Sequence, residues 1–141
     1  MQIEMLSWAL MLVGLMGQQP APASTSSASL NYDFFKTKVQ PIFLAKRQGH
    51  ARCIACHAGG TPLRLQPLSP GSTTWNEEES RKNFEAVQRV VMPGNLTSRI
   101  LIHPLAEAAG GDFFHNGGKH WSSQNDPEWQ ALKAFVMGQA K

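Results

Sequence analysis

The chain has 141 residues, which suits a single domain, and 42% of them are hydrophobic. Its 13 basic and 10 acidic side chains give a formal net charge of +3, a balance too even for a nucleic-acid-binding protein. So mild a basic excess favours, at most, docking to an acidic partner protein.

The first stretch of the chain has the pattern of an export signal. An apolar run from Leu6 to Met16 is followed by Ala21 and Ala23, small residues of the kind that a signal peptidase reads. The expected organisation is a signal peptide at 1–23, a flexible leader at 24–30 and one domain at 31–141. The run is short for a membrane span, but the first five residues lack the usual Lys or Arg. An uncleaved membrane anchor is therefore the alternative.

Two helices are predicted in the first two thirds of the domain. One opens at Asn31 and ends at 46–49, with Pro41 disturbing it. Its apolar face holds Phe35, Val39, Ile42 and Phe43. The other follows a capping box with Thr74 as N-cap and Glu77 at N3, and runs from Trp75 to about Val91. Its buried stripe is Phe84, Val87 and Val91.

Two further helices are predicted toward the C-terminus. A short one spans 95–102 and ends before Pro104. Residues 106–119 hold four glycines without a clear period, which predicts a loop. The last helix begins with Asp126 as N-cap and Pro127 at N1. Its buried side chains are Trp129, Leu132, Phe135 and Val136. No segment predicts a strand or a repeat.

The most informative motif is Cys53-Ile54-Ala55-Cys56-His57, which reads C-x-x-C-H. Two thiols at this spacing can each add to one vinyl group of a porphyrin, and the adjacent imidazole can bind the iron, so the pattern is typical of covalently attached haem c. Cys53 and Cys56 are the only cysteines of the chain, so both are used.

Three alternatives exist for these side chains: a dithiol–disulfide redox pair, a zinc site completed by another histidine, or a simple disulfide. A redox pair of the thioredoxin kind lies near a βαβ pattern, and none is visible here. Zinc sites of this type usually have a second ligand pair, which is missing. Haem is therefore the favoured interpretation. Leu63, Leu65 and Leu68 follow in a proline-rich stretch, and we expect them to line the haem edge or to anchor the loop in the core.

The residues alone leave the distal iron ligand, opposite His57, open. His115 and His120 lie in a glycine-rich loop whose backbone can approach a flat ring closely. Met92 is a further candidate, although a methionine at the end of a helix also fits a core position. His50 is too close to Cys53 in sequence to reach the opposite face.

Other polar residues have ordinary structural explanations. His103 follows a short helix, where a histidine interacts favourably with the helix dipole. The carboxylates of Glu77 to Glu79 lie in the first turn of a helix, where acids are also favourable. Asp112 and Asp126 have no recognisable partner in the sequence. No catalytic residue is therefore predicted.

Over residues 32–138 the chain resembles the Planctomycete-type cytochrome c domains, which are themselves similar to class I cytochromes c. The matching segments are Val39-Gln40-Pro41-Ile42-Phe43, C-x-x-C-H at 53–57, Pro93-Gly94, His115-Asn116-Gly117-Gly118, and the aromatic last helix from Pro127. The resemblance implies an all-α fold of about four helices around one covalent haem, with His115 as distal ligand. Met92-Pro93 looks like the Met-Pro that supplies this ligand in many class I cytochromes c. Met92 and His120 therefore remain alternatives.

These observations predict a one-electron carrier and not an enzyme, since two protein ligands on the iron exclude a substrate. The expected partners are redox proteins, with no nucleic acid, no small-molecule substrate and no membrane unless the N-terminal segment is an anchor. We expect an exported, periplasmic or otherwise extracytoplasmic protein, because bacteria attach haem covalently outside the cytoplasmic membrane. The alternatives are a haem-based sensor or small-ligand-binding module, which needs a weakly held distal site, and a haem subunit of a larger redox complex.

Overall fold

The computed structural model describes residues 28–139, and this part of the chain is all-α, which confirms the predicted fold class. The first helix is continuous through α1 (Tyr32–Phe34), the π-helical η1 (Phe35–Val39) and α2 (Gln40–Leu44). It is followed by α3 (Cys53–His57), α4 (Glu77–Gln88), α5 (Arg99–Ile102), the short 3-10 helix η2 (Glu107–Ala109) and α6 (Pro127–Val136). This makes five α-helical units where about four were expected, because the C-x-x-C-H motif forms a helix of its own. The predicted signal peptide and most of the leader lie outside the described residues.

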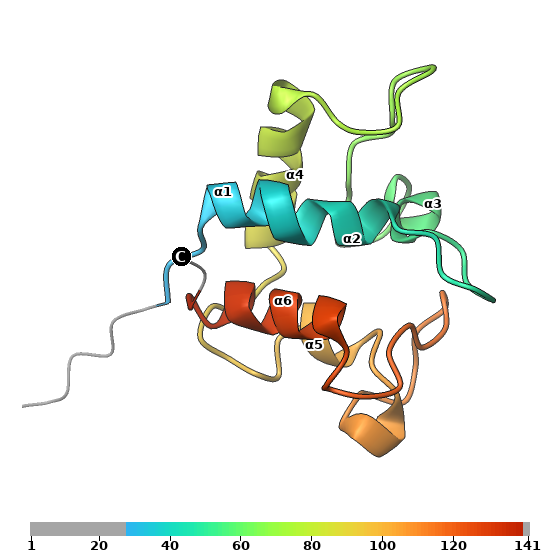
Figure 1. Cartoon of the computed structure of the whole chain (residues 1–141), viewed down its shortest axis with the longest axis vertical. Helices are drawn as coiled ribbons and strands as arrows, with labels where there is room; N and C mark the ends of the chain where they lie inside the picture. Colours follow the sequence, from blue (N-terminus) through green and yellow to red (C-terminus); the bar gives the residue numbers. More distant parts are fainter. Residues whose placement is uncertain (1–27, 140–141) are drawn as a thin grey trace, which may run out of the picture.

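The first helix and α6 lie side by side, and α4 crosses the first helix at a steep angle (Figure 1). The short α5 packs against α6, and α3 packs against α2. The loop before α3 and the loop that leads into α6 both reach toward the end of the molecule where α3 lies (Figure 1). No helix within residues 28–139 is long and apolar enough to cross a membrane.

Pro41 disturbs the first helix as expected, and the disturbance is a π-helical turn at 35–39. A proline has no N–H to give to the carbonyl four residues earlier, that of Thr37, and its ring crowds that carbonyl. The backbone widens just before it, so that Gln40 N–H bonds the carbonyl of Phe35. Phe35 and Val39 are nonetheless fully buried, so the predicted apolar face is kept.

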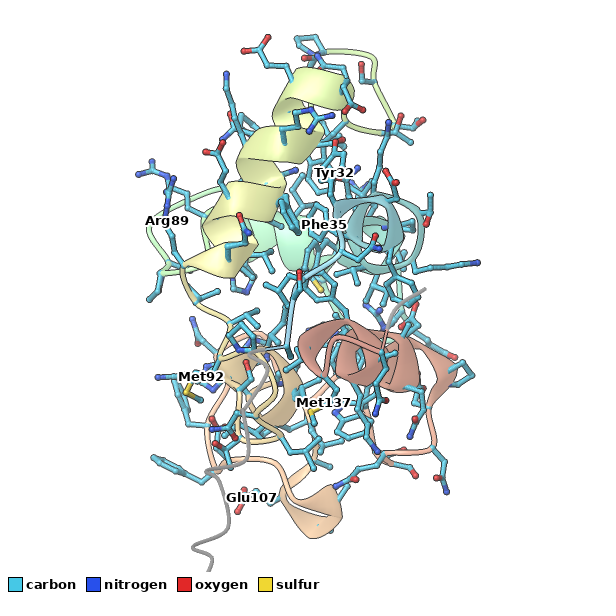
Figure 2. All side chains as sticks on the ribbon, turned by 90° about the vertical axis from the view of Figure 1, so that its left-hand side faces the viewer. Tyr32, Phe35, Arg89, Met92, Glu107 and Met137 are labelled. Atoms are coloured by element: carbon cyan, nitrogen blue, oxygen red, sulfur yellow. The ribbon has the colours of Figure 1, made fainter. Side chains whose placement is uncertain are left out.

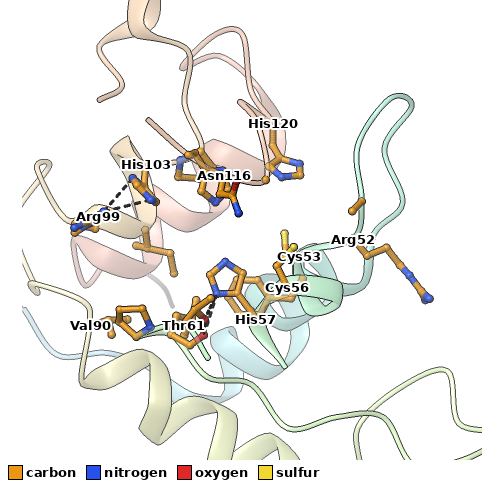
Figure 3. A pocket seen from close by; sticks show the side chains of 18 of the residues that line it. Arg52, Cys53, Cys56, His57, Thr61, Val90, Arg99, His103, Asn116 and His120 are labelled. Atoms are coloured by element: carbon orange, nitrogen blue, oxygen red, sulfur yellow. Dashed lines mark hydrogen bonds between the residues drawn. The ribbon is translucent and has the colours of Figure 1, made fainter. Parts of the chain in front are cut away.

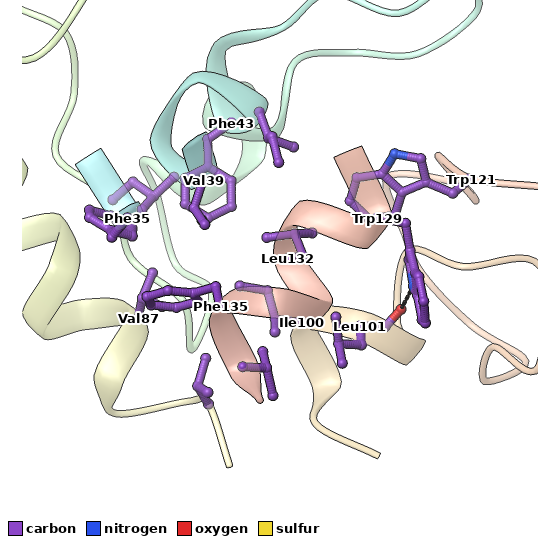
Figure 4. Close-up of a cluster of buried hydrophobic side chains, with 14 of the residues drawn as sticks. Phe35, Val39, Phe43, Val87, Ile100, Leu101, Trp121, Trp129, Leu132 and Phe135 are labelled. Atoms are coloured by element: carbon purple, nitrogen blue, oxygen red, sulfur yellow. Dashed lines mark hydrogen bonds between the residues drawn. The ribbon is translucent and has the colours of Figure 1, made fainter. Parts of the chain in front are cut away.

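A cluster of phenylalanines holds the first helix, α4 and α6 together. Figure 4 shows its buried members Phe35, Phe43 and Phe135, with Val87 of α4. The ring centroid of Phe35 lies 5.3 Å from that of Phe84, 5.9 Å from that of Phe135 and 6.4 Å from that of Phe43. Phe35 and Phe135 have no exposed surface, and Val87 of α4 is equally buried beside them. Each such side chain stabilises the fold by about 1.5–3 kcal/mol. These contacts join elements from both ends of the chain.

Tyr32 adds a second contact between the first helix and α4 (Figure 2). Its ring meets Phe84 edge-on at 5.3 Å, and the Arg81 guanidinium lies 4.5 Å from its centroid. The Tyr32 hydroxyl donates to Glu77, which also pairs with Lys36. The acidic first turn of α4 is thus partly neutralised by the first helix.

The predicted capping box of α4 is displaced by two residues. The N-cap is Asn76, not Thr74: its side chain accepts from Glu79 N–H at 2.9 Å, and the Glu79 carboxylate accepts from Asn76 N–H at 2.8 Å. Trp75 stays outside the helix because its indole is 5% exposed and donates to the carbonyl of Gln66. The Trp75 side chain thereby also anchors the loop before α4, through its hydrogen bond to Gln66.

Two predicted helices are shorter than expected. α4 ends at Gln88 instead of Val91, and a turn follows in which Val90 N–H bonds the carbonyl of Val87, three residues earlier. α5 begins at Arg99 instead of Asn95. The side-chain oxygen of Asn95 accepts a hydrogen bond from Thr97 N–H at 2.8 Å. Such a local hydrogen bond between side chain and backbone competes with helix formation.

The last helix agrees with the prediction in its start and in its buried face. Asp126 is the N-cap and accepts from Glu128 N–H at 2.9 Å, and Pro127 occupies N1. The buried side chains are Trp129, Leu132, Phe135 and Val136, as expected from their spacing. The loop at 106–119 is irregular apart from η2, which also agrees with the sequence.

Gly111 is the glycine of this loop at which a side chain would collide with backbone. A Cβ on Gly111 would lie 1.9 Å from the carbonyl oxygen of Leu105 and 2.9 Å from that of Ile102, so backbone would have to move. We expect Gly111→Ala to lower the free energy of unfolding by about 1–3 kcal/mol or more, measured by urea denaturation. Gly60→Ala is the control, because its Cβ would meet nothing within 4 Å. Equal stability of the two variants would contradict the observed close approach.

Candidate functional site

A cavity of about 430 Å³ opens between two walls of the molecule (Figure 3). One wall comes from α2 and α3, and the other from α5, α6 and the loop at 114–121. This size is within the range of about 300–1,000 Å³ that is usual for cofactor and ligand sites. The lining is mostly apolar, with Phe43, Leu63, Ile100 and Leu132 among its residues.

The C-x-x-C-H motif lies on one wall of this cavity. Cys53, Cys56 and His57 occupy one turn of α3 at spacings of three and one, and all three line the cavity. Residues at i, i+3 and i+4 share one face of a helix, which is why they point the same way. Both thiols are free: Cys56 is exposed and Cys53 is partly buried. Burial raises the pKa of the Cys53 thiol, although the nearby Arg47 acts in the opposite direction.

Arg47 fastens the cysteine end of the cavity to α6. Its guanidinium bonds Glu128, donates to the carbonyl of Ile42 at 3.3 Å and lies 5.3 Å from the Trp121 ring centroid. The nitrogen Nη1 lies 4.0 Å from Cys53 Sγ. The side chain of Arg47 is 14% exposed and that of Glu128 is 35% exposed, so the pair is partly buried. Sequence reasoning treated Arg47 only as a helix-end residue, because no local pattern links it to Glu128.

The ring of His57 is held through its Nδ1 atom. Nδ1 lies 2.9 Å from the carbonyl oxygen of Leu63, which can only accept, so Nδ1 carries the proton. The Thr61 hydroxyl lies 3.0 Å from the same nitrogen and donates to the same carbonyl. In the neutral imidazole with its proton on Nδ1, the lone pair is on Nε2. A ligand histidine is commonly oriented by such a bond from its other nitrogen.

His115, on the opposite wall, is oriented in the same way. Its Nδ1 lies 2.5 Å from the carbonyl oxygen of Gly118, so Nδ1 again donates and Nε2 keeps its lone pair. Burial lowers the pKa of His115, and the nearby His103 and His57 lower it further, whereas the Gly118 bond opposes them. Gly118 has a φ of +79°, a backbone conformation that glycine adopts at little cost. The lowered pKa favours the neutral imidazole, the form that binds metals.

The rings of His57 and His115 lie at a separation that suits one metal ion between them. Their centroids are 6.4 Å apart and their planes differ by 27°. Two imidazoles that bind one ion from opposite sides have centroids about 6 Å apart, because each bond to the metal is about 2 Å and each nitrogen lies about 1 Å from its ring centre. Across residues 28–139, no group of three or more His, Cys, Asp or Glu side chains could hold a metal by itself.

His120 lines the same wall as His115, at a centroid distance of 5.7 Å. Its Nδ1 is buried and has no hydrogen-bond partner among the described residues. Burial, with smaller effects from His50 and Arg47, lowers its pKa from 6.5 to about 4. His50 lies 4.7 Å away, centroid to centroid, and does not line the cavity.

Asp112 has two partners that the sequence does not reveal. His103 Nδ1 lies 2.6 Å from its carboxylate, and Lys119 Nζ lies 3.0 Å from the other carboxylate oxygen. Burial raises the pKa of Asp112, but these two bonds outweigh it and the pKa is lowered. His103 also lines the cavity, 4.7 Å from His115, so its contacts go beyond the expected helix-end position.

The other predicted residues are spread over several places. Met92 is 42% exposed at the edge of the molecule, outside both the cavity and the core (Figure 2). Of the three leucines after the motif, Leu63 lines the cavity and Leu65 is buried in the core, whereas Leu68 packs against that core. Sequence reasoning missed Arg99 and Phe114, which also line the cavity.

The low pKa of His120 predicts a pH effect on stability. The folded chain binds fewer protons than the unfolded chain between the ordinary pKa of 6.5 and the folded value of about 4. The free energy of unfolding should therefore fall as pH drops through this window. Denaturant titrations between pH 7 and pH 4 should show that the free energy of unfolding falls less in His120→Gln than in the parent protein, because the glutamine amide does not titrate. Parallel curves for the variant and the parent protein would contradict the buried, neutral imidazole.

No family model matches this chain, and searches of the curated proteins and the solved structures find no significant match. The resemblance to Planctomycete-type cytochromes c therefore remains a prediction from the motifs. A function must be argued from the cavity, from the two facing imidazoles and from the cysteine pair beside them.

Proposed function

We propose that this chain is a single-haem c-type cytochrome that carries one electron at a time between redox partners outside the cytoplasmic membrane. The observation that carries the proposal is the pair His57 and His115, which face each other at 6.4 Å across a cavity lined by Cys53 and Cys56. Neither the motif nor the facing pair alone would be as specific. Together they provide two thiols for attachment and two imidazoles for the axial positions of one iron.

The residues of the cavity fit a haem in three respects. Cys53 and Cys56 lie on one turn of one helix, as attachment to one edge of a ring requires. Each histidine offers Nε2, because its Nδ1 is already bonded to a backbone carbonyl. The remaining lining is mainly apolar, which suits the faces of a porphyrin.

When bound, haem supplies an iron centre that takes up and releases one electron. The part of the protein is to keep that centre closed. His57 and His115 would hold the iron from the two walls of the cavity and would leave no place on it for a substrate or water. Their hydrogen bonds to backbone carbonyls restrain both imidazoles, so that little reorganisation of these side chains would accompany a change of charge. The apolar side chains of Phe43, Leu63 and Leu132 would keep water away from the bound group.

A sensor or small-ligand-binding module is the second candidate, and one observation favours it. His115 is held by a loop and not by a helix, next to Gly117 and Gly118. A ligand on such a loop can be displaced more easily than one on a helix. A haem subunit of a larger complex is a third candidate. Phe113 and Phe114 are 84% and 56% exposed beside the cavity, and exposed apolar pairs favour contact with another protein.

Covalent attachment is the first expected property. The purified protein should keep its haem through denaturation and acid–acetone extraction, because two thioether bonds survive both. Cys53→Ala combined with Cys56→Ala should lose all of it, whereas each single variant should retain one bond. Mass spectrometry of the denatured chain measures the added mass directly. Complete release of haem from the unaltered protein would refute the proposal.

Six-coordinate, low-spin iron is the second expected property. His115→Ala should open the distal position, so that the reduced variant binds carbon monoxide while the parent does not. Met92→Leu is the matched control and should leave the optical spectrum unchanged, because Met92 lies away from the cavity. A sulfur-to-iron charge-transfer band that disappears in Met92→Leu would overturn the ligand assignment. If His120→Ala opened the iron instead, His120 would be the distal ligand.

A further inference from the structure

The hydrogen bonds that orient His115 belong to its own loop and not to the body of the protein. Its Nδ1 donates to the carbonyl oxygen of Gly118, and Gly118 N–H donates to the carbonyl oxygen of His115 at 2.8 Å. Both bonds therefore orient the imidazole only relative to the neighbouring backbone. The distance of 6.4 Å between the ring centroids of His115 and His57 depends on what holds the loop in place.

Few hydrogen bonds tie the His115 loop (residues 113–119) to the rest of the protein. The residues on either side of it, Asp112 and His120, donate their N–H groups to carbonyls at and just beyond the end of α5, at 3.0 and 2.7 Å. Among residues 28–139, Lys119 is the one member of the loop with a hydrogen bond to a residue outside it. Its side chain is therefore the polar link between the loop and the body of the protein.

Lys119 spans the base of the loop with all three N–H groups of its ammonium. Nζ donates to the carbonyl oxygen of His103 at 3.0 Å, to a carboxylate oxygen of Asp112 at 3.0 Å and to the carbonyl oxygen of Asp112. An ammonium has three N–H groups, so none of them is left without an acceptor. The side chains of Lys119 and Asp112 are 22% and 26% exposed, so water competes less for these bonds than at an open surface.

The three bonds join the end of the loop both to its beginning and to the core. Asp112 directly precedes the loop, whereas His103 follows α5 as its C-cap. α5 packs against α6, and its Leu101 has no exposed surface, so the His103 carbonyl belongs to a firmly packed element. Lys119 thus closes the loop against a part of the protein that does not move easily.

The other side chains of the loop give it little support. Phe113 and Phe114 are exposed, and two glycines follow further along. A glycine has no side chain to pack and leaves the backbone free to change conformation. Asn116 nevertheless lies on the wall of the cavity opposite His57 (Figure 3). The loop therefore covers the cavity from a position that its own packing does not secure.

We propose that Lys119 is a positioning residue, which holds the His115 loop closed and thereby keeps His115 within reach of the iron. The inference rests on the proposed function, because it concerns an iron ligand. Lys119 does not line the cavity, so it acts through the loop alone. A loop held in this way favours the electron carrier over the sensor, whose distal ligand must be able to leave.

Lys119→Met tests the inference at the iron, because methionine keeps an unbranched side chain but has no N–H group. The reduced variant holoprotein should bind carbon monoxide, which the parent does not, since the open loop withdraws His115. Stopped-flow absorption measures this binding at a temperature where circular dichroism shows both proteins folded. Lys38→Met is the matched control: it removes the same charge from an exposed lysine that has no hydrogen-bond partner within residues 28–139, and it should behave like the parent.

Amide hydrogen exchange, followed by NMR on the same holoproteins, reports on the loop itself. Gly118 N–H and His120 N–H are the hydrogen-bonded amides next to Lys119. In Lys119→Met both should exchange about tenfold faster or more, because hydrogen bonds from a charged donor no longer oppose the opening of the loop. The amides of α6 should exchange at the rate of the parent, and so should all amides of Lys38→Met outside its own helix.

Asp112→Ala is a second, milder variant. It removes one of the three acceptors of Lys119 and leaves both backbone carbonyls in place. Exchange at Gly118 and His120 should therefore be faster than in the parent, but slower than in Lys119→Met. If Lys119→Met does not fold, Asp112→Ala carries the same test.

The outcomes separate this inference from the proposed function. Covalent haem with parental exchange rates at Gly118 and His120 in the variants that fold would overturn the role of Lys119 and leave the cytochrome proposal intact. Faster exchange without carbon monoxide binding in Lys119→Met would also overturn it, because the loop would then open without releasing the iron. Equal carbon monoxide binding in Lys38→Met would overturn it as well, since a general effect of charge would suffice. A parent protein without covalent haem would overturn both proposals.

Discussion

The packing of Phe35 against Phe84 and Phe135 is the constraint on which the rest of the structure depends. It joins the first helix, α4 and α6, and so brings the two ends of the described chain together. α3 follows the first helix after one short loop, and the loop that carries His115 leads directly into α6. Once the two long elements are packed, those two segments must face each other. The cavity is thus a result of core packing some distance away from it.

The same kind of hydrogen bond orients both His57 and His115 in the cavity. A backbone carbonyl, from Leu63 in one case and Gly118 in the other, accepts a hydrogen bond from Nδ1. Backbone groups change little when side chains are substituted, so these carbonyls are stable acceptors for the two rings; at His57 the Thr61 hydroxyl adds a side-chain contact to the same nitrogen. The cysteine end of the cavity is held differently, by the partly buried pair of Arg47 and Glu128. That pair connects the loop before α3 to the first turn of α6.

Local sequence patterns predicted those parts of the structure that depend on local chemistry. The start of α6 at Asp126 and Pro127 was predicted because a capping side chain bonds the N–H of a residue close to it in sequence, and a proline restricts only the backbone beside it. The cap of α4 was misplaced, since three successive glutamates offer two equivalent registers and only the burial of Trp75 decides between them. His115 was paired with His57 only through the family resemblance. The structure places their ring centroids 6.4 Å apart, and their role as iron ligands stays a prediction. The contact between Arg47 and Glu128 was not predicted, because contacts between residues 81 positions apart leave no periodic trace.

The π-helical turn at 35–39 can also be described in terms of chain length. A π-turn holds one residue more than the α-helical turn that it replaces. Because the extra residue is accommodated within that one turn, the helix before it keeps its orientation relative to α2. Phe35 and Val39, at the two ends of the turn, both stay fully buried, whereas the three side chains between them are exposed. Deletion of one of these three residues would therefore return the turn to α-helical spacing and leave Phe35 in the ring cluster that joins three helices.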